Sequence, residues 1–238
     1  MTSSTSGATT TSPASCAKAE DVERIAANLA EVRRRIVAAG GDLARVRIVA
    51  VTKTFAPEVV RAAAAAGLND VGENYVDELE SKRAELADLA LRWHYLGALQ
   101  SNKIARVALA ADVVSGVSRA KEITKIAATR AGAVIDVQVD ATGQAGRNGA
   151  APGDVPALVA MARAQGLRLR GLMTVASPEP ERAREQFALV ASLAEELGVE
   201  ELSMGMSDDF ELAVAQGSTE IRVGRLLFGP RTAPARLA

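Results

Sequence analysis

Residues 46–54 read VRIVAVTKT, and this stretch decides between the two folds that the rest of the chain allows. VRIVAV is short and rich in β-branched residues, which predicts a buried strand of the kind found in parallel sheets. An open doubly wound sheet usually carries a glycine-rich turn after its first strand. The turn here, Val51-Thr52-Lys53-Thr54, contains no glycine. The stretch therefore favours a closed barrel over an open sheet.

Outward from this strand, helical and strand patterns alternate along the chain. An amphipathic helix is predicted before it, over residues 20–39. Seven further strands are predicted at residues 69–71, 92–96, 112–115, 133–139, 168–174, 201–203 and 219–223. The helices between them are predicted at residues 57–66, 75–86, 101–110, 119–130, 154–165, 180–197 and 208–215. Strict alternation requires parallel pairing with crossover helices, and eight strands are the number in a (β/α)8 TIM barrel.

The composition is that of an ordinary globular chain. The 238 residues are 48% hydrophobic and 24% charged, with a net charge of −1, which argues against general disorder and weakly against a nucleic-acid partner. No apolar run approaches the roughly 20 residues of a membrane span. Residues 1–18 are rich in Ser, Thr, Ala and Pro, so we expect a disordered tail followed by one barrel domain over residues 19–238. The single cysteine, Cys16, fits a reducing cytoplasm.

Lys53 is the most informative candidate for chemistry. It directly follows an apolar strand, and active sites of TIM barrels lie at the carboxyl ends of the strands. Desolvation in the barrel mouth lowers the pKa of a lysine, and a neutral lysine forms Schiff bases with aldehydes. The alternative is a solvated lysine at a strand end, because its long stem easily reaches water.

The last two loops of the predicted barrel carry a second signal. SMGMSDD at residues 203–209 leaves one strand and opens a helix, for which Ser207 is a suitable N-cap. Gly224-Arg225 follows the last strand, where glycine allows the backbone to approach a ligand closely. These two loops form the recurrent phosphate site of this fold, although simple capping and a turn explain them equally well. Asp208 and Asp209 would repel a phosphate, so we expect them to point outward.

Three other charged features have less specific readings. Arg222 lies inside the last strand; facing inward it needs an acceptor, such as a heteroaromatic ring nitrogen, and an external salt bridge is the alternative. His94 is the only histidine, so a metal site or a Ser-His-Asp triad is not supported, and we expect a packed or pocket-lining side chain. The charged stretch at residues 77–88 is expected to be a solvated helix face.

Five segments together resemble one known family. They are AVTKT at 50–54, GENYVDE at 72–78, WHYLGALQSNK at 93–103, GLMT at 171–174, and SMGMSDDFELAVAQGSTEIRVGRLLFGPR at 203–231. In order and spacing they resemble the pyridoxal-phosphate-binding homeostasis proteins, which are related in fold to the N-terminal barrel of alanine racemase. The resemblance implies a single TIM barrel of the type III fold of pyridoxal 5′-phosphate (PLP) proteins, with PLP as the cofactor.

The resemblance assigns seven positions to PLP: Lys53, Asn74, Met206, Ser207, Arg222, Gly224 and Arg225. It implies that the lysine forms a Schiff base with PLP and that Arg222 faces the pyridine nitrogen. Asn74 and Met206 fall beside the ring. The other three positions fall where the family holds the phosphate, largely through backbone N–H groups. No catalytic residue and no metal ligand are implied.

The sequence departs from the family in two places. The Gly-x-x-Gln segment usually holds a histidine where this chain has Ala98. The loop after the fifth strand usually has an acidic residue, a lysine and a glycine, whereas here residues 144–149 read QAGRNG. These departures put in doubt how the mouth of the barrel is guarded and how it meets partners.

The same resemblance bears on whether the chain is an enzyme. Racemisation needs proton donors on both faces of the bound cofactor, and the racemase relative takes the second, a tyrosine, from an additional β domain that we expect this chain to lack. The tyrosines here, Tyr75 and Tyr95, belong to barrel elements. We therefore expect a cytoplasmic, monomeric protein that buffers PLP and delivers it to apo PLP-dependent enzymes without turnover. An amino-acid racemase is the alternative, and a Schiff-base aldolase fits less well.

Overall fold

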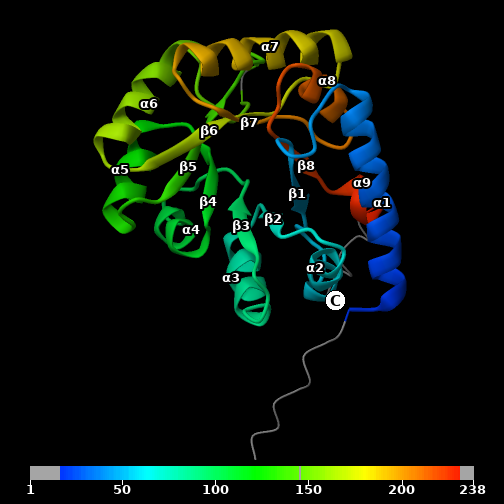
Figure 1. The fold of residues 1–238 in the computed structure, drawn as a ribbon. Coiled ribbons are helices and arrows are strands. Elements are labelled where there is room, and N and C mark those ends of the chain that lie inside the picture. Colours follow the sequence, from blue (N-terminus) through cyan, green and yellow to red (C-terminus); the bar gives the residue numbers. More distant parts are fainter. Residues whose placement is uncertain (1–16, 145, 231–238) are drawn as a thin grey trace, which may run out of the picture.

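The strands form one closed barrel in a computed structural model that describes residues 17–144 and 146–230 (Figure 1). All neighbouring strands are parallel, and β8 pairs with β1 to close the barrel. The strands are β1 Arg47–Val51, β2 Asp70–Glu73, β3 Arg92–Tyr95, β4 Val113–Val117, β5 Val134–Val139, β6 Arg168–Thr174, β7 Glu201–Ser203 and β8 Glu220–Val223. The predicted (β/α)8 TIM barrel is confirmed, and an open doubly wound sheet is excluded.

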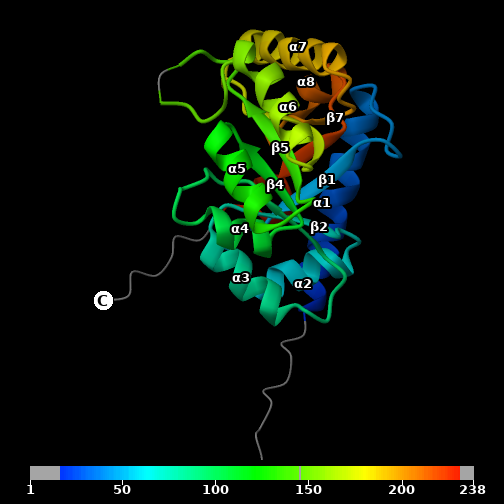
Figure 2. The same ribbon diagram turned by 90° about the vertical axis from the view of Figure 1, so that its left-hand side faces the viewer.

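Helices surround the strands on the outside, as the two perpendicular views show (Figures 1 and 2). They are α1 Ala19–Ala38, α2 Pro57–Ala65, α3 Val76–Glu85, α4 Ile104–Ala110, α5 Ala120–Thr129, α6 Val155–Ala164, α7 Pro180–Glu196, α8 Phe210–Ala215 and α9 Arg225–Phe228. A short 3-10 turn, Pro152–Asp154, precedes α6. Each crossover helix buries an apolar stripe against the sheet, which leaves the strand ends free to carry function.

Helix α1 precedes the first strand and covers the seam where the barrel closes. Its apolar residues at three- and four-residue spacing, Ile25, Leu29, Val32 and Ile36, are all buried. Asn28 on the same helix donates a hydrogen bond of 2.9 Å to the carbonyl oxygen of Leu227 in α9. In Figure 1 the blue α1 accordingly lies beside the red α9. The N-terminal helix thus fixes the segment that follows the last strand.

Two helix boundaries differ by more than one residue from the sequence-based prediction. Helix α8 begins at Phe210, with Asp209 as its N-cap, so the prediction that Ser207 caps it is wrong. The bend at Gly205, with a φ of +91°, sets up a turn over residues 207–209 that delays the helix. Helix α4 likewise begins three residues late, after a turn over residues 101–103. The one-turn helix α9 was not predicted, because four residues carry no periodicity.

The inside of the barrel near the amino ends of the strands is filled by ion pairs. Arg170 donates to Asp136 through Nε at 2.8 Å and to Glu220 through Nη2 at 3.0 Å. Both carboxylates are fully buried. Ser115 and Ser203 each add a hydroxyl hydrogen bond to this group, at 2.7 and 2.8 Å. This end of the barrel is therefore closed by a buried network of ion pairs and hydroxyl hydrogen bonds.

Some of the sequence-based expectations concern residues that the structure does not describe. The predicted tail at residues 1–18 lies outside the described residues except for Ala17 and Lys18. Cys16 also lies outside them, as do residues 231–238. Within residues 17–144 and 146–230, no helix is long and apolar enough to cross a membrane. The same residues contain no cluster of His, Cys, Asp and Glu side chains that would hold a metal ion.

Candidate functional site

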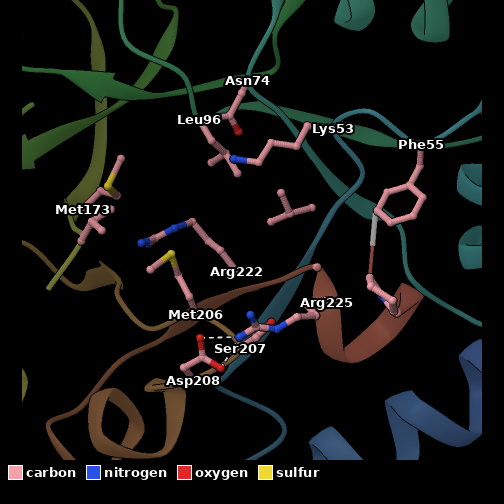
Figure 3. A pocket seen from close by; sticks show the side chains of 15 residues that line it. Lys53, Phe55, Asn74, Leu96, Met173, Met206, Ser207, Asp208, Arg222 and Arg225 are labelled. Carbon is pink, nitrogen blue, oxygen red and sulfur yellow. Dashed lines mark hydrogen bonds and ion pairs between the residues drawn. The ribbon is translucent and has the colours of Figure 1, made fainter. Parts of the chain in front are cut away.

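A cavity of about 580 Å³ opens at the carboxyl ends of the strands (Figure 3). Its lining includes all seven positions singled out from the sequence: Lys53, Asn74, Met206, Ser207, Arg222, Gly224 and Arg225. Figure 3 shows Lys53 and Asn74 on one side of the cavity and Met206, Ser207 and Arg225 on the other. Tertiary structure thus brings together residues from the ends of four strands, β1, β2, β7 and β8.

Lys53 enters the cavity from a tight turn directly after β1. The preceding Thr52 is fully buried, and its carbonyl oxygen accepts the Phe55 N–H at 3.1 Å to close the turn. Thr54 on the other side has a φ of +68°, the only positive φ outside glycine among the described residues. A β-branched residue rarely adopts this conformation, so the surrounding structure must hold it. Lys53 therefore lies in a closed turn with an uncommon backbone conformation at the next residue.

Arg222 points into the barrel from the middle of β8 and is 95% buried, with 5% of its surface exposed. Its guanidinium donates to the carbonyl oxygen of Thr174 at 2.7 Å and to the hydroxyl of Ser203 at 2.9 Å. Burial lowers the pKa of Arg222, while the carboxylates of Glu220 and Asp209 act in the opposite direction. The alternative of an external salt bridge is therefore wrong, and protein oxygens supply the acceptors that the inward position requires.

The loop after β7 folds back on itself to present its backbone to the cavity. Asp209 Oδ1 accepts the Met206 N–H at 2.6 Å, and a Cβ on Gly205 would lie 2.7 Å from the Cα of Phe210. Asp209 is half-buried rather than directed outward as expected, and burial raises its pKa. Asp208 is exposed but lines the cavity instead of pointing away from it, and it forms an ion pair with Arg225 in the neighbouring loop. The two loops are therefore joined across the mouth.

Gly224 lies where the backbone comes closest to the strand carrying Lys53. A Cβ at Gly224 would be 3.1 Å from the carbonyl oxygen of Val51, closer than nearly all real contacts of this kind. Any larger residue would therefore shift the loop at the rim of the cavity. A glycine at this point gives a ligand close access to backbone N–H groups.

Several apolar residues of the cavity were not among the predicted site residues. They are Val51, Phe55, Leu96, Met173, Val175, Gly229 and Pro230. Leu96 follows β3 and Met173 lies near the end of β6, so a position at a strand end was the available signal for both. The rings of Phe55 and Phe228 are in tilted contact, with centroids 5.2 Å apart and planes inclined by 55°; the two residues are 173 positions apart, so sequence alone does not reveal this contact.

Two expectations about charged side chains met different outcomes. His94 is packed as expected: it is fully buried and its Nε2 lies 2.8 Å from Asp70 Oδ1, near the amino ends of the strands. The expectation of a solvated face over residues 77–88 is wrong at Lys82, which is 5% exposed. Its Nζ lies 2.8 Å from Glu73 Oε1 because α3 packs this position onto β2, against the turn that carries Lys53. A charged sequence pattern alone does not identify such a position.

The two departures from the family pattern lie away from the cavity lining. Ala98 is exposed, and its carbonyl oxygen accepts the Tyr95 hydroxyl at 3.3 Å. The described residues of the loop at 144–149 are exposed or half-buried, and none of them lines the cavity. The departures therefore leave the described wall of the cavity intact.

Comparisons with known proteins agree with this geometry. The family model for the alanine racemase N-terminal domain matches residues 21–232. The pyridoxal phosphate homeostasis protein of Pseudomonas aeruginosa is 44% identical over 223 residues, which cover 90% of this chain and 95% of that protein. The chain belongs to the pyridoxal phosphate homeostasis protein family. The relative of the same name from Escherichia coli strain K12 is 34% identical over 227 residues, which cover 87% of this chain and 97% of that protein.

Solved structures of this family share the fold. PipY from Synechococcus elongatus without PLP matches with a TM-score of 0.78 at 34% identity, covering 86% of this chain and 100% of that one. PipY with PLP bound matches with a TM-score of 0.73 at 36% identity and the same coverage. Alanine racemase from Bacillus anthracis matches with a TM-score of 0.67 at 19% identity, and the match covers 90% of this chain and 57% of that one. At so low an identity, the likeness concerns the fold alone.

Proposed function

We propose that this member of the family holds PLP as a Schiff base on Lys53 and serves in PLP buffering and delivery without catalytic turnover. The observation that carries the proposal is the convergence of Lys53, Arg222 and the two loops at Ser207 and Gly224 on one cavity. The PipY structure with PLP bound, at 36% identity, supports the same ligand for this chain.

The cavity residues fit the chemical parts of PLP. The close approach at Gly224 and the neighbouring turn at Ser207 suit a phosphate, which binds exposed backbone N–H groups. Arg222 keeps its guanidinium inside the barrel, where it can donate to the pyridine nitrogen. An arginine does not give up its proton to a ring nitrogen, so the ring stays unprotonated and withdraws electrons weakly. This pairing alone does not decide against racemisation, because the racemase relative uses the same pairing.

Lys53 supplies the covalent attachment. Its neutral amine adds to the aldehyde carbon, a C=N bond replaces the C=O bond, and the oxygen leaves as water with the two amine hydrogens. When bound, PLP supplies an aldehyde that exchanges readily between amines. Release to an acceptor protein therefore needs only the reverse hydrolysis or transfer to another amine, with no further group from this chain.

The lining of the cavity favours binding over racemisation. Among the described lining residues, the titratable ones are Lys53, Asp208, Arg222 and Arg225, and Asp208 is already paired with Arg225. Tyr95 is buried, and burial raises its pKa. The lining therefore offers Lys53 as a base on one face and no tyrosine on the other, whereas racemisation needs a proton donor on each. A monomeric cytoplasmic protein that hands PLP to apo-enzymes is the role we propose.

The proposal is tested by trapping the attachment chemically. Purified protein incubated with PLP should show a visible absorbance band, and borohydride should remove it while fixing PLP to the peptide that contains Lys53. The Lys53→Ala variant should lose both the band and the modified peptide. A band that persists in this variant, or a label on another lysine, would show that the attachment site is wrong.

A second measurement separates the binding protein from the racemase. The protein should exchange deuterium into the Cα position of alanine no faster than free PLP at the same concentration. Exchange well above that rate, abolished by Lys53→Ala, would establish the racemase instead.

A further inference from the structure

Beneath the turn that carries Lys53 lies a group of charged side chains from β2 and α3. The group consists of Glu73, Glu78 and Lys82, and we refer to it as the anchoring cluster. Glu73 is fully buried and Lys82 is 5% exposed. Lys82 Nζ lies 2.8 Å from Glu73 Oε1 and 3.1 Å from Glu78 Oε2, so one ammonium is shared between two carboxylates.

The anchoring cluster contacts the backbone on both sides of Lys53. On one side, Lys82 Nζ donates to the carbonyl oxygen of Thr52 at 2.8 Å. The Thr52 hydroxyl in turn donates to Glu73 Oε1 at 2.7 Å. On the other side, the Thr54 N–H donates to Glu78 Oε2 at 2.8 Å. The residues that flank Lys53 are therefore both bound to the cluster.

The contact at Thr54 explains how its unfavourable backbone conformation persists. A positive φ at a threonine survives only where surrounding interactions over-determine it. The carboxylate of Glu78 supplies a charge-assisted acceptor for the Thr54 N–H, and Lys82 holds that carboxylate in place. The Thr54 N–H and Lys82 keep the pKa of Glu78 below its usual range although burial acts to raise it.

We propose that Lys82 and Glu78 are positioning residues that fix the Thr52–Thr54 turn and thereby direct the Lys53 amine into the cavity. The inference rests on the proposed function, because it assigns the turn a role in attaching PLP. A single missing anchor would let the turn relax, so that the amine meets the aldehyde less often and in poorer orientation. None of the three cluster residues lines the cavity, and their side chains bind the turn at Thr52 and Thr54, on either side of Lys53.

The test compares cluster variants with matched controls on the same helix. The cluster variants are Lys82→Met, Glu78→Ala and Glu78→Gln. The controls are Arg83→Met, which breaks an ion pair with Asp112, and Glu80→Ala, which breaks one with Arg106. Three quantities are measured: the rate at which borohydride traps PLP on Lys53 after mixing, hydrogen exchange at the Thr54 amide without PLP, and the melting temperature without PLP.

Lys82→Met and Glu78→Ala should slow trapping at Lys53 by about tenfold or more, the factor expected when a hydrogen bond to a charged group is lost. Both should also speed exchange at the Thr54 amide. Glu78→Gln should fall between Glu78→Ala and the native chain, because the amide oxygen still accepts the Thr54 N–H. Arg83→Met and Glu80→Ala should lower the melting temperature less than Lys82→Met does, because their ion pairs are partly exposed, and should leave trapping within about twofold of native.

Trapping rates that follow the melting temperature alike in cluster and control variants would overturn the proposal. So would native trapping in Glu78→Ala, which is the deciding variant if Lys82→Met fails to fold. Failure of the proposed function has a different signature: the native chain itself would not be trapped at Lys53. In that event, hydrogen exchange at the Thr54 amide still tests whether the cluster holds the turn. Unchanged exchange in Glu78→Ala would reject that role, and faster exchange would support a role in holding the turn without one in attaching PLP.

Discussion

Two fully buried carboxylates at opposite ends of the barrel have opposite surroundings. Glu220, at the start of β8, accepts from Arg170 and Ser203, and Arg47 lies 3.4 Å away. Burial would raise its pKa, but His94 and Arg170 hold it well below the usual range. Glu73, at the end of β2, faces one ammonium, and its Oε2 has no hydrogen-bond partner among the described residues.

The difference shows that the number of donors around a buried carboxylate differs between the two ends of the barrel. A buried carboxylate is ionised when several donors surround it and is held closer to neutrality when few do. At the amino end of the barrel, Arg170 pairs with both Asp136 and Glu220, although Nδ1 of the buried His94 has no hydrogen-bond partner among the described residues. At the carboxyl end, burial raises the pKa of Glu73 to about 7 despite Lys82 and Thr52. Charge near the site is therefore incompletely satisfied, which is typical of functional regions.

The largest effect is expected at the amino end of the barrel, in the ion pairs of Arg170. Arg170→Met should lower the free energy of unfolding by about 3–5 kcal/mol, because Asp136 and Glu220 would be left as uncompensated buried charges. Arg47→Met should cost no more than about 1 kcal/mol, since its ion pairs are partly exposed. Chemical denaturation of both variants measures the difference. Equal losses would show that Arg170 does not hold the network together.

The free energy of unfolding should depend on pH through the titration of Glu73. Its pKa is about 7 in the folded chain against 4.5 without the fold, so between these values the unfolded chain releases a proton that the folded chain keeps. The contribution of Glu73 to stability is thus fully present below about pH 4.5 and is lost as the pH rises to about 7, on the order of 3 kcal/mol at most.

Denaturation across this range compares the native chain with Glu73→Gln, which cannot titrate. The variant should show a smaller fall in the free energy of unfolding between about pH 4.5 and 7. Parallel curves for the two proteins would contradict the raised pKa of this carboxyl group.

Arg222 lies between the two ends, because it shares Ser203 with Glu220 and faces the cavity. Arg222→Ala should weaken PLP retention by about 1–3 kcal/mol, the scale of a lost hydrogen bond to a charged group. Equilibrium dialysis measures retention, with Arg106→Ala on the outer surface as the control. Native retention in Arg222→Ala would remove this residue from the proposed site.

The smallest effect is expected at the mouth. Ser207→Ala should weaken PLP retention by about 1 kcal/mol, because backbone N–H groups of the loop remain available to the phosphate. The loss should vanish when pyridoxal, which has no phosphate, replaces PLP in the dialysis. An equal loss with pyridoxal would place Ser207 away from the phosphate.

The sequence by itself predicted the helices and strands and favoured their closure into a barrel. The alternation of short β-branched strands with amphipathic helices is local, and the turn without glycine at residues 51–54 favoured a closed barrel, which the strand pairing of the structure confirms. It also marked Lys53, Arg222 and Gly224, since function in a parallel barrel lies at strand ends and each of these residues lies within two positions of the last residue of a strand. Such signals need no knowledge of distant contacts.

Tertiary structure alone decided what surrounds those residues. Lys82 looks like one more surface charge on α3 until β2 places Glu73 against it. Three other features likewise depend on contacts between residues far apart or on loop curvature. They are the cap at Asp209, the tilted ring contact between Phe55 and Phe228, and the burial of Glu220. Burial and pairing are properties of the folded neighbourhood, whereas periodicity belongs to the chain. That is why the position of Lys53 at the mouth of the barrel was predictable from the sequence and the side chains packed beneath its turn were not.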